Sequence, residues 1–237
     1  MATGTGLGNV VLFEDFNSDS PSASRWIETV ASSATQNIQD KHGGWWRQVL
    51  AGDDADATLI AWELTWEIDE GFPIIMETRL QTSVAASSSI FVGFTDNNAE
   101  SGAVVIEDED GTLNTVATDA YGFLLEGEQD ATWQAVGVDS DTDKTQAAMT
   151  GTTDAANATT QVVRTEAWPT DSGTVFYYVD GVLGSKRTSW VDTSLVLCPA
   201  VSSDDRNTAY NVDIDYVYVT APRGSYCLLY TSPSPRD

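Results

Sequence analysis

Short runs of alternating apolar and polar side chains, separated by turn-forming residues, make up most of this 237-residue chain. In residues 72–80 the apolar positions repeat with a period of two, so that Glu77 and Arg79 point to the face opposite Met76 and Leu80. This is the pattern of a half-buried β-strand. By contrast, residues 90–94 are apolar on both faces, which is typical of a central strand covered by two layers.

The remaining pattern predicts an all-β protein, because no helical periodicity extends beyond a turn or two. Asp180-Gly181 predicts a tight hairpin between two strands. About a dozen short strands without intervening helices favour a two-sheet antiparallel sandwich or a barrel. Further strands are expected at residues 10–13, 45–50, 121–125, 133–138, 161–166, 174–179, 182–183 and 212–219.

We expect one domain over residues 10–224, preceded by a flexible segment at residues 1–9, because no Pro- or Gly-rich linker divides the chain. Residues 225–237 form a tail of different composition. Read back through the genetic code, residues 227–237 match a transposon-end adapter used in sequencing libraries, which predicts a translated artefact from environmental DNA. Cys198 is then the one native cysteine, and we expect it to be buried.

The acidic composition excludes some partners. With 36 acidic and 11 basic residues, the formal net charge of −25 repels nucleic acid and anionic membrane surfaces. The first nine residues have neither the basic region nor the apolar run of a signal peptide, and no stretch is long and apolar enough to span a bilayer. These features predict a protein made in a cytoplasm.

Several segments together resemble the concanavalin A-like (laminin-G-like) jelly-roll sandwiches that tailed bacteriophages encode among their virion structural genes. The segments that carry the resemblance are, in chain order, residues 13–16, Trp26, and residues 76–80, 93–96, 118–123, 133–138, 176–181, 197–199 and 212–219. The resemblance implies a concanavalin A-like jelly roll from about residue 10 to residue 219. It implies function less directly, because this fold serves lectins, glucanases, adhesion modules and capsid parts.

The sequence favours a protein that is not an enzyme. Glucanases of this fold present alternating carboxylates from a Glu-x-Asp-x-Glu strand, and the stretches 67–72, 107–111 and 126–130 each fail that pattern. The single histidine, His42, excludes His-rich zinc sites and makes a Ser-His-Asp or Cys-His mechanism a poor fit. We therefore expect no catalytic residue and no required cofactor.

Two candidate binding sites remain. Trp45 and Trp46 are adjacent in a strand and point to opposite faces, so one of them could stack on a sugar ring. Asp139, Asp141 and Asp143 alternate like calcium ligands, although Lys144 stands where a calcium loop needs Gly. Ordinary solvated turns are the favoured explanation of these aspartates and of the other acidic turns, and core packing explains most of the remaining tryptophans.

Three functions stay open from the sequence. The first is a structural protein of a tailed-phage virion, either a capsid decoration or an appendage, located in the particle and contacting capsid proteins and copies of itself as a homo-oligomer. The second is a carbohydrate-binding module that attaches to a host surface. The third is a glycoside hydrolase.

Overall fold

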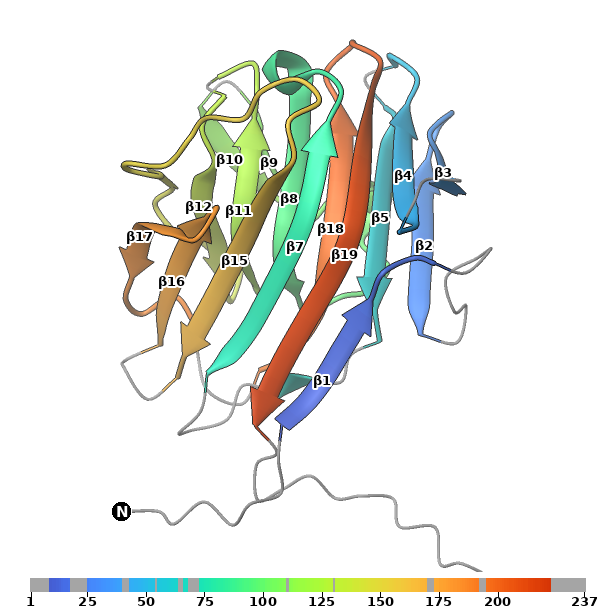
Figure 1. The fold of residues 1–237 in the computed structure, drawn as a ribbon. Coiled ribbons are helices and arrows are strands. Elements are labelled where there is room, and N and C mark those ends of the chain that lie inside the picture. The colour runs from blue at the N-terminus through green and yellow to red at the C-terminus, as the bar shows by residue number, and fades with distance from the viewer. Residues whose placement is uncertain are drawn as a thin grey trace, which may run out of the picture.

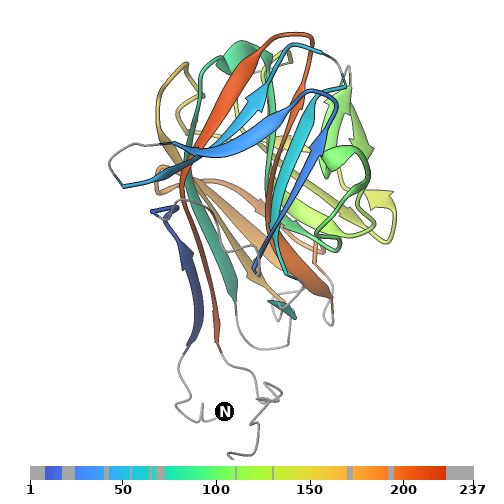
Figure 2. The same ribbon diagram turned by 90° about the vertical axis from the view of Figure 1, so that its right-hand side faces the viewer.

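Two antiparallel β-sheets pack face to face in the structure, a computed structural model (Figures 1 and 2). The expected all-β sandwich is confirmed. The residues that the structure describes are 9–17, 25–39, 43–53, 55–63, 66–67, 73–109, 111–129, 131–169, 173–191 and 195–222. The expected flexible segment and the adapter-like tail therefore fall almost entirely outside the described residues. Within those residues, no helix is long and apolar enough to cross a membrane.

The sheet nearer the viewer in Figure 1, here called the front sheet, is organised around its longest strand, β19. One side of β19 pairs with β7, and the other side pairs first with β4 and then with β1. The end of β19 and β1 continue beyond the rest of the sandwich as a two-stranded ribbon (Figure 2). The order is β17 (Val182–Arg187), β16 (Thr174–Val179), β15 (Gln161–Trp168), β7 (Ile74–Thr82), β19 (Tyr210–Pro222), β4 (Trp45–Leu50) and β3 (Thr35–Gln39), with β1 (Asn9–Glu14) beside β19.

The second sheet, here called the back sheet, has β8 at its centre, and all eight residues of β8 are buried as expected for a central strand. The order is β13 (Thr142–Asp143), β12 (Gln134–Asp139), β11 (Ala120–Glu126), β8 (Ser88–Thr95), β18 (Val196–Asp205), β5 (Ala57–Trp62) and β2 (Trp26–Ala31), with β14 (Ala147–Ala148) beside β12 and β6 (Trp66–Glu67) beside β18. A separate hairpin joins β9 (Ile106–Glu109) and β10 (Thr112–Thr115), and two 3₁₀ turns cover Ala85–Ser87 and Ser101–Ala103.

The core lies between the sheets and is rich in aromatic rings. Phe123 meets both Trp133 and Tyr177 edge to face, with ring centroids 5.9 and 5.2 Å apart. Such contacts add to the area that these rings bury. On β7 the predicted alternation holds, because Met76 and Leu80 enter the core. The core therefore fixes which residues of each front strand point outward.

The outer faces of the two sheets differ. The segment between β8 and β11, which includes the β9–β10 hairpin, packs Val105 and Ile106 into a second apolar cluster with Phe91 and Leu124 of the back sheet. Cys198 lies in the same cluster and is buried, as predicted. Most outer side chains of the front sheet are instead half-buried or exposed, up to 59% for Phe13, although Asp213 and Thr220 of β19 are buried. That outer surface, on β16, β15, β7, β19, β1 and β4, is called the open face below.

Candidate functional site

A β-bulge in β19 sets the side chains at the centre of the open face. The pairing between β19 and β7 shifts between Ile214 and Tyr216, so Asp215 is an extra residue in the strand. Ile214 and Val217 both point into the core although they are three residues apart. As a result Tyr216 and Tyr218 both lie on the outer surface.

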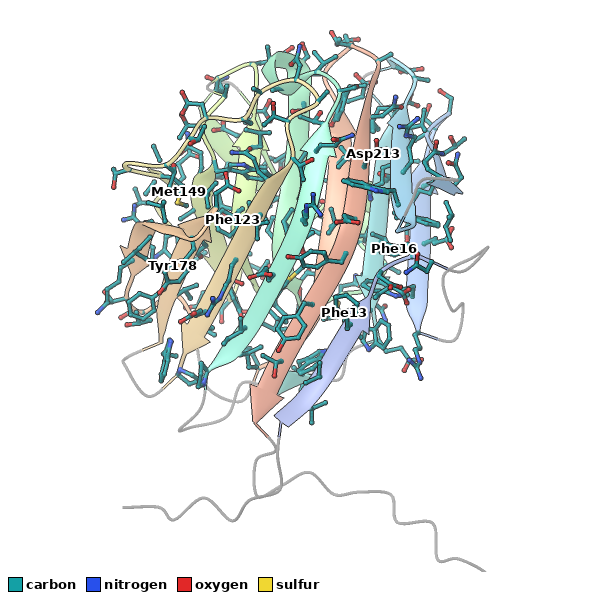
Figure 3. All side chains as sticks on the ribbon, viewed as in Figure 1. Phe13, Phe16, Phe123, Met149, Tyr178 and Asp213 are labelled. Carbon is teal, nitrogen blue, oxygen red and sulfur yellow. The ribbon has the colours of Figure 1, made fainter. Side chains whose placement is uncertain are left out.

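Five residues at one level of the open face are direct cross-strand neighbours. Tyr178 of β16 lies opposite Arg164, which lies opposite Glu77 of β7. Glu77 in turn lies opposite Tyr218, and Tyr218 opposite Phe13 of β1. Four strand intervals of about 4.8 Å make this row about 19 Å long. Figure 3 shows its two ends, Tyr178 and Phe13, at opposite sides of the front sheet.

Ion pairs hold most charged side chains of the open face in place. Arg47 donates to both carboxylate oxygens of Asp213, at 2.5 and 2.8 Å, and this hydrogen bonding is the main cause that raises the pKa of Arg47. Arg79 Nη1 lies 2.7 Å from Asp215 Oδ2. A third pair, Arg164–Glu166, lies on β15. Paired charges of this kind resist reorientation, and bidentate pairs do so most strongly.

Glu77 differs from these carboxylates because its hydrogen bond comes from a neutral group. Tyr216 donates its hydroxyl to Glu77 Oε1 at 2.7 Å. Burial, and next the bond to this carboxylate, raise the pKa of Tyr216 above its ordinary value, so the phenol remains a donor. The Tyr216 ring also packs against Phe13, with centroids 5.9 Å apart.

A shallow pocket of about 300 Å³ opens beside Glu77. Arg164 lies across the strand from Glu77 and also lines the pocket; its guanidinium lies 5.5 Å from the centre of the Tyr178 ring and bonds to Glu166. Burial, and next the Glu166 charge, raise the pKa of Tyr178. The pocket is lined by Glu77, Val162, Arg164, Glu166, Tyr178 and Gly181. Carboxylate, guanidinium, phenol and ring faces together can hydrogen-bond and stack on a polyhydroxylated ligand.

The two predicted stacking tryptophans have different positions. Trp46 is 2% exposed, packs against Phe16 and donates to Gln36 Oε1 at 2.8 Å, so it belongs to the core and cannot meet a ligand. Trp45 points outward, half-buried, with Arg79 6.0 Å from its ring. The alternation of β4 therefore leaves Trp45 as the candidate for stacking on a sugar ring at this edge of the open face.

The hairpin between β12 and β13 separates the three predicted calcium ligands. Asp139 pairs with Thr142 and Asp143 with Val138, so Asp139 and Asp143 point to opposite faces of the hairpin. Lys144 is paired with Asp139 at 2.7 Å, and Asp141 is in the turn. In the described part of the chain, no three or more His, Cys, Asp or Glu side chains are grouped so that they could bind a metal ion.

The stretches compared with a glucanase strand do not form one in the described residues. Glu107 and Asp108 belong to the β9–β10 hairpin over the back sheet, and Glu126 ends β11 before a turn. Of residues 67–72, only Glu67 is described, and His42 also lies outside the described residues. The polar side chains of the open face come from other segments. The sequence feature that pointed to them was the alternation that places Glu77 and Arg79 on the outer side of β7.

A second set of ionisable side chains, here called the Arg206 cluster, lies between β9, β11 and β18. Arg206 pairs with Glu107, Glu126 and Asp204, at 3.1, 3.5 and 3.3 Å. Asp108 accepts a bond from Gln146 and exposes its backbone oxygen to Arg206. One arginine therefore faces three carboxylates and one backbone carbonyl. Burial is the main cause that raises the pKa of Glu126 to about 7, and burial and then Glu107 raise that of Asp204.

The two packed antiparallel sheets have the concanavalin A-like jelly-roll fold, which is also the fold of the solved structures below. Searches against family models and curated proteins found no match. Among solved structures, the Emp47p carbohydrate recognition domain is similar with a TM-score of 0.60 and 12% identity, over 90% of this chain and 95% of that one. The Bacillus licheniformis β-glucanase has the same score and identity, over 90% and 98%.

A Shewanella oneidensis MR-1 protein of unknown function is also similar, with a TM-score of 0.60 and 14% identity over 90% of this chain and 86% of that chain. At these identities the likeness concerns the fold. The comparisons lend no support to a phage origin, to capsid partners or to an adapter-derived tail, which stay predictions from the sequence.

Proposed function

We propose that this protein binds carbohydrate chains on the open face without cleaving them. The observation that carries the proposal is the row from Tyr178 to Phe13, in which two charged groups lie between one ring on β16 and two adjacent rings on β19 and β1, over about 19 Å. Exposed rings give sugars an apolar platform, and fixed charged groups between them bind hydroxyls. A row of this length suits several linked sugar units better than a single one.

The charge pairing of the open face favours binding over hydrolysis. Strands β7, β15 and β19 present four outward carboxylates, and three of them, Glu166, Asp213 and Asp215, are paired with arginines. An arginine partner stabilises the ionised carboxylate and opposes the protonated form that a general acid needs. The likeness to both lectins and glucanases is compatible with this proposal.

Replacing two rings of the row tests the binding surface. The double variant Phe13→Ala/Tyr218→Ala should bind an arrayed glycan at least about tenfold more weakly than the parent, because two stacking platforms are lost. The array should include β-glucans, mucin glycans and amino-sugar oligomers. Val30→Ala, at a side chain that is 51% exposed on β2 of the back sheet, is the control and should bind like the parent.

Two results would contradict the proposal. The first is that the folded parent binds no glycan on the array. The second is release of reducing ends when the parent is incubated with the glycans that it binds, which would identify an enzyme. Circular dichroism of each variant establishes that weaker binding does not come from unfolding.

A further inference from the structure

Glu77 occupies the middle of the row, and no cation of the described residues forms an ion pair with it. Among the described residues, its side-chain hydrogen-bond partner is the neutral Tyr216 hydroxyl, and the arginine directly across the strand, Arg164, is bound to Glu166. The three other carboxylates of the open face each have an arginine. The row therefore has one negative charge that its own strands leave unpaired.

Aromatic rings surround this charge on the side of β19. Tyr218 is the direct cross-strand neighbour of Glu77, which places their β-carbons about 5 Å apart. Tyr216 is hydrogen-bonded to the same carboxylate and packs against Phe13. A carboxylate beside ring faces is the combination that binds an ammonium group, through an ion pair and cation–π attraction.

The other charges of the open face argue against an acidic ligand. Arg47, Arg79 and Arg164 already have carboxylate partners, so a sulfate or uronate would have to displace one of them. The net charge of −25 repels polyanions and attracts polycations at long range. Both effects favour a ligand that carries positive charge.

We propose that the sugar unit bound over Glu77 carries a free ammonium group, so that the open face prefers glycans of unacetylated amino sugars to neutral or acidic ones. This inference rests on the proposed function and narrows its ligand class. Glu77 and the Tyr218 ring contact the ammonium group, while Tyr216 holds the carboxylate in place. The neighbouring units of the chain lie towards Tyr178 and Phe13.

Short oligomers of glucosamine, N-acetylglucosamine and glucose test the inference by calorimetry, since they differ at the amino position. The parent should bind the glucosamine oligomer about tenfold more tightly than the other two, a difference of about 1.4 kcal/mol. Added salt should reduce this preference, because it screens an exposed ion pair.

Glu77→Gln removes the charge but keeps a side-chain carbonyl oxygen to accept the Tyr216 bond, so its preference for glucosamine should disappear while neutral oligomers still bind. Glu128→Gln, in an exposed turn after β11, changes the net charge equally and is the matched control. Equal affinity of the parent for all three oligomers, or equal loss in both variants, would overturn the inference and leave glycan binding intact. Absence of binding to every oligomer and arrayed glycan would overturn both proposals.

Discussion

The position of a residue within its strand decides whether its side chain packs in the core or lies on the outer surface, where it can contact a ligand. Trp45 and Trp46 are neighbours of the same type, yet one packs in the core and the other lies on the open face. On β7, Met76 packs in the core in the same way, and its neighbour Glu77 lies on the open face. The two-residue period of a strand therefore assigns structure and candidate function to alternate positions.

Alanine substitutions at the two tryptophans should separate these roles. Trp46→Ala should lower the free energy of unfolding by about 3–5 kcal/mol, because it leaves a cavity and unpairs Gln36. Trp45→Ala should cost less than about 1 kcal/mol, since its ring is on the surface. Urea unfolding of the two single variants measures both values, each serving as the control for the other. Similar losses would contradict the placement of the two rings.

At the scale of strands, the sequence predicts the strands in which apolar and polar residues alternate with a period of two. The strands expected at 45–50, 121–125 and 174–179 are found at those positions or within a residue of them. Strands β2 and β5 were not predicted. Every residue of β5 from Ala57 to Ala61 is buried, because the chain covers both of its faces, and such a strand shows no alternation.

The open face could be predicted only in part. Its β7 residues follow from alternation, but the bulge at Asp215 shifts the period within the run 212–219, and no local rule gives that shift. The hydrogen-bond partner of Glu77, Tyr216, lies 139 residues away in the sequence. Strand order therefore had to be known before Tyr178, Arg164, Glu77, Tyr218 and Phe13 could be placed in one row.

The Arg206 cluster should make the packing of β9, β11 and β18 sensitive to pH. The folded state holds the pKa of Glu126 at about 7, whereas an unfolded chain has the ordinary Glu value of about 4.3. Between these values the folded state binds more protons, so the contribution of Glu126 to stability is greatest near about pH 4 and falls as pH rises to about 7, by at most ~4 kcal/mol. Above that range this contribution is constant.

Glu126→Gln should reduce this slope, because the amide does not titrate, while Asp204, whose pKa is also raised, still contributes to it. The measurement is the free energy of urea unfolding at about pH 5 and about pH 8. Glu128→Gln, which changes the net charge equally at an exposed position, should retain the slope of the parent. Parallel pH profiles for Glu126→Gln and the parent would show that Glu126 does not contribute to the slope.

The charge of the whole molecule acts in addition to these local pairs. A net charge of −25 on one domain means that the folded state suffers more self-repulsion than the expanded chain. Salt shortens the range of that repulsion, to about 10 Å at about 0.1 M. The exposed ion pairs of the open face, such as Arg79–Asp215, are weakened as well, but they contribute little to stability.

Sodium chloride should therefore raise the thermal midpoint of unfolding, with most of the gain below about 0.3 M, where the screening length changes most. Thermal scans at pH 7 in increasing salt measure the effect, and sucrose at matched osmolality controls for general exclusion of the cosolute. The same titration should weaken binding of glucosamine oligomers at Glu77, because that contact depends on charge. A midpoint that stays constant or falls would mean that local ion pairs outweigh the net charge in holding this sandwich together.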